Sequence, residues 1–261
     1  MSDELDGVDY ATQIGRLRGI LEGLGGRVRS RRLDDHRAFA RRIGLAVRGA
    51  GRPSVVVGDD VGAELGRPGA GPQARSHALV LPTARGELVR DGLVHCVGND
   101  IGEAAPGENR AFAQIVLVAH PETVSLDLFE LESNQYLANR VAGYMARTVP
   151  GRLWVRFSKK LLASGFGLFE LGCCLLAAYR MDFMEIEAAE AVLVCGDDAL
   201  MRALDSIAAE VKVLSGRQRK LTLQESGLYE CADLDCDNCD ERVVCDALKD
   251  VTIRYRKRGA N

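Results

Sequence analysis

Leu153-Trp-Val-Arg-Phe157 and Ala191-Val-Leu-Val-Cys195 are short apolar runs of strand length, and each is followed by residues with helical spacing. A third such run, Ile115–Ala119, comes earlier in the chain. Apolar strands that alternate with helices are typical of α/β proteins. The sequence therefore predicts an α/β fold with a largely parallel sheet and flanking helices. The helices expected in this part are 126–146, 158–163, 168–179 and about 197–213.

The amino-terminal ninety residues differ in composition from this part. Leu17, Ile20, Leu21 and Leu24 predict a first helix, and Asp34 or Asp35 can cap a second one. Ten arginines between Arg16 and Arg48 indicate either a solvated helical face or a surface that binds an anion or a partner. Further expectations are strands at 54–57, 77–81 and 93–97, with a Gly- and Pro-rich loop at 62–77. We expect three regions: 1–90, 91–225 and a cysteine-rich module at 226–261.

Charge and hydropathy exclude two classes of partner. Lys and Arg total 34 against 37 Asp and Glu, which gives a net charge of −3 and no basic excess for nucleic acid. No apolar run reaches the roughly 20 residues of a membrane span. The start Met-Ser-Asp-Glu-Leu-Asp is not typical of a secretory signal, so we expect a cytoplasmic protein.

The eight cysteines form two groups. Cys96, Cys173, Cys174 and Cys195 are scattered in apolar stretches and are expected to be buried, reduced thiols. The other four follow the spacing Cys-x4-Cys-x2-Cys-x5-Cys, which predicts a metal or iron–sulfur site. These predicted ligands are Cys231, Cys236, Cys239 and Cys245.

Two kinds of metal fit four thiolates. Structural zinc usually takes two close cysteine pairs, whereas this segment has only Cys236 and Cys239 at that spacing. Four thiolates in one short stretch are compatible with a four-iron, four-sulfur cluster. We favour the iron–sulfur cluster, with zinc as the alternative.

Trp154 is the only tryptophan of the chain, and it shares one face of its predicted strand with Arg156. An indole beside a guanidinium can stack on a flat ligand such as adenine while the cation meets a phosphate. The alternative is that Trp154 belongs to the core and Arg156 pairs with a carboxylate. Both residues are candidate cofactor-binding residues. The sequence identifies no catalytic residue.

Three segments in register resemble the β subunit of the carbon monoxide dehydrogenase/acetyl-CoA synthase complex. Val97-Gly-Asn-Asp-Ile-Gly-Glu103 is similar to the family's Val-Gly-Pro-Asp-Ile-Asp-Glu, and Leu153-Trp-Val-Arg-Phe-Ser-Lys-Lys160 to its Thr-Trp-Val-Arg-Ile-Ser-Lys-Glu. Phe169-Glu-Leu-Gly172 looks like the family's His-Leu-Gly-Gln-Leu-Leu stretch. The agreement covers residues ~90 to ~225, about half of the chain.

This resemblance implies an acyl-transfer setting. The family joins a methyl group, CO and coenzyme A at a nickel site bridged to a four-iron cluster, and its central domain contacts coenzyme A and redox partners. By position, Trp154 and Arg156 are implied as a coenzyme A contact, and Cys231 as the first cluster cysteine. The family's downstream Cys-Gly-Cys is absent from these 261 residues. We therefore expect an iron–sulfur protein of an electron-transfer or acyl-transfer complex with a protein partner, and not a complete acetyl-CoA synthase. The alternative is a non-enzymatic accessory module with a structural zinc knuckle.

Overall fold

Residues 9–46, 48, 54–69, 71–103, 108–124, 126–135, 140–149 and 152–225 are described by the structure, a computed structural model. The chain divides into two units, Met1–Lys212 and Val213–Asn261. The first unit contains both β-sheets. Of the second unit, only residues 213–225, the end of a helix, are described.

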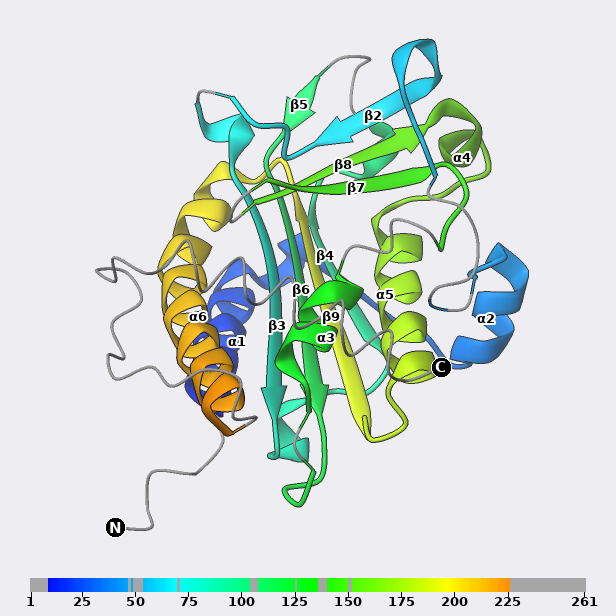
Figure 1. Cartoon of the computed structure of the whole chain (residues 1–261). Helices are drawn as coiled ribbons and strands as arrows, with labels where there is room; N and C mark the ends of the chain where they lie inside the picture. Colours follow the sequence, from blue (N-terminus) through cyan, green and yellow to red (C-terminus); the bar gives the residue numbers. More distant parts are fainter. Residues whose placement is uncertain are drawn as a thin grey trace. The chain divides into compact units, whose positions relative to one another are not determined.

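The larger sheet has five strands: β1 (Val28–Arg32), β4 (Leu93–Gly98), β9 (Ala188–Cys195), β6 (Phe112–Ala119) and β3 (Ser76–Thr83), in that spatial order (Figure 1). The pairs β4–β9 and β6–β3 are parallel, whereas β1–β4 and β9–β6 are antiparallel. The prediction of a largely parallel sheet is therefore wrong, and the fold is a mixed α/β fold. Apolar runs identify strands, but the direction in which two strands pair depends on the path of the chain between them.

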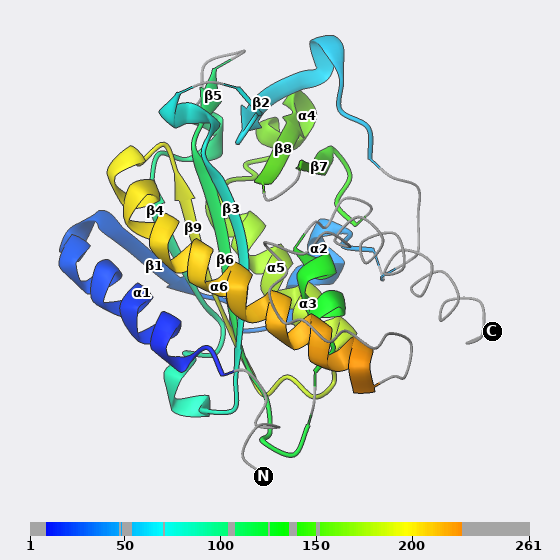
Figure 2. The same ribbon diagram turned by 60° about the vertical axis from the view of Figure 1, so that its left-hand side comes forward.

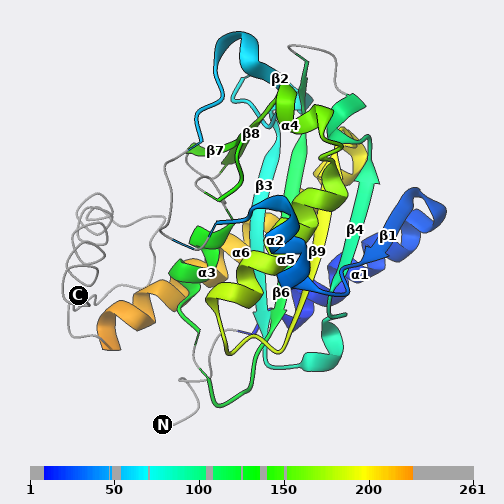
Figure 3. The same ribbon diagram turned by 90° about the vertical axis from the view of Figure 1, so that its right-hand side faces the viewer.

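Helices cover both faces of this sheet. Helices α5 (Leu168–Asp182) and α2 (His36–Ile43) lie on one face (Figure 3). On the other, α1 (Ala11–Leu24) runs beside the part of α6 (Asp198–Glu225) that ends at Lys212 (Figure 2). Every residue of β6 is buried, as expected for a strand covered on both faces. The apolar residues of β6 and α5 supply much of the core.

A smaller four-stranded sheet has the order β5–β2–β8–β7 (Figure 1). Its strands are β5 (Asn109–Arg110), β2 (Val61–Leu65), β8 (Arg152–Ser158) and β7 (Tyr144–Val149). Helix α4 (Lys159–Ala163) follows β8, and the Ser158 hydroxyl caps it by accepting a hydrogen bond from the Leu161 amide. Short 3-10 helices occupy Gly25–Arg27, Gly58–Asp60, Pro72–Ala74, Gly86–Leu88 and Ile101–Glu103.

Three local predictions are wrong in this region. The helix expected at 126–146 is only the short helix α3 (Leu128–Asn134), and the chain re-enters a sheet at Tyr144. The loop expected at 62–77 contains most of β2, and residues 54–57 form no strand. Val55 and Val57 are exposed while Val56 is fully buried, so this run has the alternation of a strand without a partner.

The segment Val97–Glu103, at the end of β4, contacts the start of α5. Asp100 Oδ1 accepts hydrogen bonds from the amides of Ile101 and Leu168 at 2.6 and 2.8 Å, which caps the first turn of α5. Gly98 has a φ of +83°, and a Cβ there would lie 2.1 Å from the Cys195 carbonyl oxygen. The segment Val97–Glu103 thus caps the helix that contains Phe169–Gly172 and packs closely against the end of β9.

Candidate functional site

Trp154 and Arg156 meet at one carboxylate, that of Glu64. Glu64 lies on β2 directly opposite Arg156 in the antiparallel β2–β8 ladder. Trp154 Nε1 and Arg156 Nε donate to Glu64 Oε1 at 2.9 and 2.6 Å. Arg67 Nη1, just beyond the end of β2, donates to Glu64 Oε2 at 3.1 Å. Both carboxylate oxygens are therefore satisfied, by two donors from β8 and one from the turn after β2.

Two guanidinium groups lie against the indole. The Arg156 guanidinium carbon is 4.4 Å from the centroid of the Trp154 ring, and that of Arg147 is 5.9 Å away. Arg147 is opposite Trp154 in the β7–β8 ladder, so the strand register places it there. Both distances are within the range of a cation–π interaction. We call Glu64, Arg67, Arg147, Trp154 and Arg156 the Trp154 cluster.

The Trp154 cluster combines a buried anion with exposed cations. Glu64 is 5% exposed, Trp154 and Arg156 are half-buried, and Arg67 and Arg147 are exposed. Three guanidinium groups against one carboxylate leave two positive charges beside an aromatic surface. Such a surface suits a planar ligand that carries phosphates or carboxylates. Glu64 orients Trp154 and Arg156 before any ligand arrives, which lowers the entropy cost of binding.

The alternative interpretation of these residues is partly confirmed. Arg156 does pair with a carboxylate, as that interpretation required. Trp154, however, is half-buried on the outer face of its strand, while its neighbours Leu153 and Val155 are fully buried. The contact with Glu64 therefore does not remove the indole from solvent.

Sequence reasoning missed Glu64, Arg67 and Arg147. The first two lie at the start of the Gly- and Pro-rich stretch that was expected to be a loop, and Arg147 follows the expected long helix. Arg147 could have been found by predicting the hairpin of β7 and β8, because the register of the two strands determines which residues are opposite each other. Glu64 had no comparable signal, since its cross-strand neighbour Arg156 is 92 residues away.

The four predicted metal ligands, Cys231, Cys236, Cys239 and Cys245, lie outside the described residues. The other four cysteines are buried reduced thiols, as predicted: Cys96, Cys173, Cys174 and Cys195. Burial raises the pKa of Cys96 and Cys173 to about 12 and that of Cys195 to about 11. These thiols stay protonated at neutral pH. Within the described ranges, no group of three or more His, Cys, Asp or Glu residues is arranged to hold a metal ion.

Comparison with known families gives one match. Residues 56–200 match the family model of the CO dehydrogenase/acetyl-CoA synthase complex beta subunit, which is more than half of the chain. The chain belongs to this family. No curated protein sequence matches the chain. The matched residues contain the whole Trp154 cluster, and α1 and β1 precede them.

In the part of the chain that the structure describes, no helix has both the length and the apolar character to cross a membrane.

Proposed function

We propose that this chain is an iron–sulfur protein of an electron-transfer or one-carbon/acyl-transfer complex, and that it binds coenzyme A at the Trp154 cluster. One observation carries the ligand proposal: a single half-buried indole has two guanidinium groups against it and is fixed by a buried carboxylate. Membership of the family supports the acyl-transfer setting. A cytoplasmic location and a protein partner in that complex are part of the same proposal.

Coenzyme A has the chemistry that the Trp154 cluster recognises. Its adenine offers a flat π-surface for the indole, and its phosphates offer negative charge to Arg67, Arg147 and Arg156. Arg156 and Arg67 already share Glu64, so the exposed Arg147 is the cation with the most freedom to meet a phosphate. We expect the adenine to lie against Trp154 and the phosphates to lie towards Arg147.

Calorimetric titration of coenzyme A into the full chain tests this site. Arg147→Gln should weaken binding by roughly 5- to 30-fold, since one charge-assisted contact contributes about 1–2 kcal/mol. Arg202→Gln is the matched control, because Arg202 is exposed on α6, away from the Trp154 cluster. Equal affinities for the two variants, or no heat with the parent chain, would reject the coenzyme A site.

The donor set of the carboxyl-terminal cysteines fits an iron–sulfur cluster. Four cysteines within fifteen residues can supply four soft thiolates, and acidic neighbours such as Asp235 and Asp237 add negative charge that lowers a reduction potential. Cys231, Cys236, Cys239 and Cys245 would hold the cluster, which supplies one-electron transfer when bound.

Protein purified without oxygen distinguishes the cluster from its alternative. A brown protein with stoichiometric iron and broad visible absorption supports the iron–sulfur site. A colourless protein with one zinc ion favours the accessory module with a zinc knuckle, in which a chelator would unfold the cysteine segment. Cys236→Ser should lower the bound metal, whereas Cys96→Ser, at a buried thiol of β4, should leave the metal content unchanged.

A further inference from the structure

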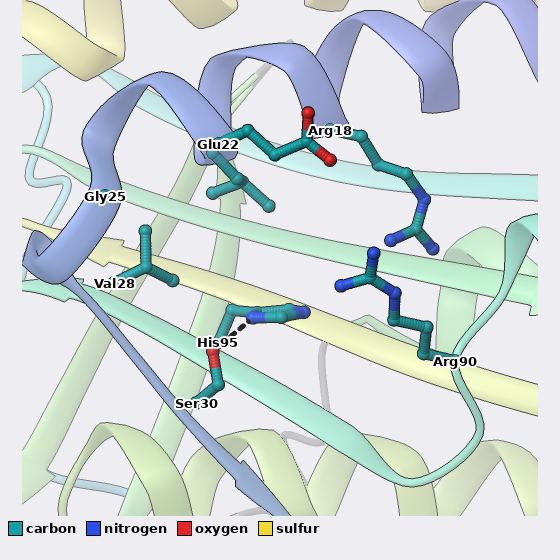
Figure 4. Close-up of a pocket in the computed structure, with 8 residues that line it drawn as sticks. Arg18, Glu22, Gly25, Val28, Ser30, Arg90 and His95 are labelled. Atoms are coloured by element: carbon teal, nitrogen blue, oxygen red, sulfur yellow. Dashed lines mark hydrogen bonds between the residues drawn. The ribbon is translucent and has the colours of Figure 1, made fainter.

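A cavity of about 200 Å³ lies between α1 and the β1 edge of the larger sheet (Figure 4). Its lining includes Arg18 and Glu22 from α1, Ser30 from β1, His95 from β4 and Arg90 from the turn before β4. Arg18, Glu22 and Ser30 precede residue 56, where the family match begins. This cavity is separate from the Trp154 cluster, which belongs to the smaller sheet.

Three side chains in this region form a continuous hydrogen-bonded chain. Ser30 and His95 are directly opposite in the β1–β4 ladder, and Ser30 Oγ is 2.7 Å from His95 Nδ1. The other ring nitrogen, Nε2, is 2.9 Å from Oε1 of Glu190 on β9. Ser30 is exposed, whereas His95 and Glu190 are 5% and 1% exposed. These hydrogen bonds thus link the solvent-accessible hydroxyl of Ser30 to the buried carboxylate of Glu190.

The surroundings of Glu190 determine where the protons lie. Arg18 donates to Glu190 Oε2 at 2.8 Å, and the Arg90 amide donates to the same oxygen at 2.6 Å. Burial by itself raises the pKa of Glu190, but the bonds from His95 and the Arg90 amide and the charge of Arg18 outweigh it and lower the pKa. An ionised Glu190 only accepts hydrogen bonds. In the tautomer of His95 that donates from Nε2 to Glu190, Nδ1 is free to accept a hydrogen bond from the Ser30 hydroxyl.

This arrangement is that of an activated serine. A nucleophile within hydrogen-bond reach of a base, with the base oriented by a third group, is the general signature of covalent acyl transfer. The exposure of these side chains also fits this signature. The nucleophile Ser30 faces solvent, from which a substrate would arrive, while the orienting carboxylate of Glu190 is shielded from water. Buried polar networks also stabilise folds. The reactivity of Ser30 therefore distinguishes a catalytic role of these three residues from a purely structural one.

A second observation indicates the charge of the ligand. The Arg90 guanidinium has no partner among the residues that the structure describes, although its backbone amide binds Glu190. Figure 4 shows the side chains of Arg18 and Arg90 pointing toward each other across the cavity. Arg18 is held by Glu190 and the Leu88 carbonyl. Because Arg18 is already paired with Glu190, Arg90 is the guanidinium left to bind a negative group of a ligand.

We propose that Ser30, His95 and Glu190 hydrolyse small acyl esters that carry a carboxylate or phosphate group, with Arg90 binding that negative group. Ser30 Oγ bonds to the acyl carbon and gives its proton to His95 Nδ1. The ester C–O bond then breaks, and the leaving alcohol takes this proton. Water attacks the acyl-serine and gives a proton to His95, which returns it to Ser30 Oγ as the carboxylic acid leaves. The net reaction is ester plus water to acid plus alcohol.

A fluorophosphonate probe applied to the full chain tests the nucleophile. The phosphonyl adduct should map to Ser30 by peptide mass spectrometry and be absent in Ser30→Ala. His95→Gln should slow labelling by about 100-fold or more. Ser164→Ala, which removes another exposed hydroxyl, should leave the labelling rate unchanged. Because Ser30 is exposed, Ser30→Ala should stay folded, which circular dichroism checks.

The anion preference has its own measurement. The parent chain should hydrolyse p-nitrophenyl hemisuccinate at least 10-fold faster than p-nitrophenyl acetate, and Arg90→Gln should remove this preference. Labelling that persists in Ser30→Ala, or hydrolysis by the parent no faster than by Ser30→Ala, would overturn the proposal. Neither result bears on coenzyme A binding at the Trp154 cluster.

Discussion

Trp154 Nε1 donates a hydrogen bond to Glu64 Oε1 at 2.9 Å, across two strands that are ninety residues apart in sequence. This bond fixes the only tryptophan of the chain to a carboxylate that is 5% exposed. The same oxygen accepts from Arg156 at 2.6 Å. The orientation of the aromatic surface therefore depends on a residue that the ligand need not touch.

Glu64→Gln should destabilise the fold and loosen the Trp154 cluster. The amide keeps one acceptor oxygen but removes the negative charge that faces Arg156 and Arg67. We expect a loss of roughly 1–3 kcal/mol in the free energy of unfolding, the range for hydrogen bonds to a charged group. Urea denaturation at pH 7 measures it. Glu130→Gln, at an exposed carboxylate 3.5 Å from Arg48, should change stability by less than about 0.5 kcal/mol. Equal effects of the two substitutions would contradict the role given to Glu64.

Gly98→Ala should strain the backbone where the end of β4 packs against the end of β9. The φ of Gly98 is +83°, and the added Cβ would lie 2.1 Å from the Cys195 carbonyl oxygen. We expect a loss of about 2 kcal/mol or more, measured as a lower midpoint of thermal unfolding. Gly19→Ala is the opposite case, because Gly19 is exposed within α1 with open space around it. That substitution should stabilise the protein by about 0.5–1 kcal/mol. An unchanged midpoint for Gly98→Ala would show that the backbone there is not constrained.

Acid should remove the stability that Glu190 contributes. Its pKa in the folded chain lies below the ordinary value of 4.5, so folding favours the ionised form. The contribution is complete above about pH 4.5 and is lost as the pH falls towards the lowered folded pKa. Glu190→Gln should lose roughly 3 kcal/mol at pH 7, because Arg18 keeps a charge without its buried partner.

Urea denaturation at pH values from 7 to 3 measures how the ionisation of Glu190 contributes to the free energy of unfolding. The difference in unfolding free energy between the parent and Glu190→Gln should shrink on acidification. Glu87→Gln, at an exposed position, should follow the parent at every pH. A difference that stays constant with pH would mean that folding does not lower the pKa of Glu190.

The sequence predicted the elements that are decided locally. The strands around 115–119, 153–157 and 191–195 and the helix from Leu168 are present. Their apolar residues are buried in the core, on both faces of β6 and on one face of β8. The burial of Cys173 and Cys174 followed from the same pattern. The Asp35 cap of α2 was one of the two predicted, and its carboxylate accepts from the amides of Arg37 and Ala38.

The strands that the sequence did not predict depend on pairing with other strands of the fold. Val28-Arg-Ser-Arg-Arg32 has no apolar alternation, and it is a strand because β4 pairs with it. Tyr144, Met145 and Ala146 end the stretch that was expected to be a helix, but they begin β7 because they pair with β8. Both candidate sites depend on such strands: Ser30 is on β1, and Arg147 is on β7.

The fluorescence of Trp154 gives the most direct test of the proposed ligand, since no other tryptophan contributes to the emission. Coenzyme A titrated into the full chain should change the intensity or wavelength of this emission with saturation, and should protect it from quenching by acrylamide. Arg147→Gln should shift the titration to higher coenzyme A concentration. Emission and quenching that remain unchanged at saturating coenzyme A would contradict binding at the Trp154 cluster.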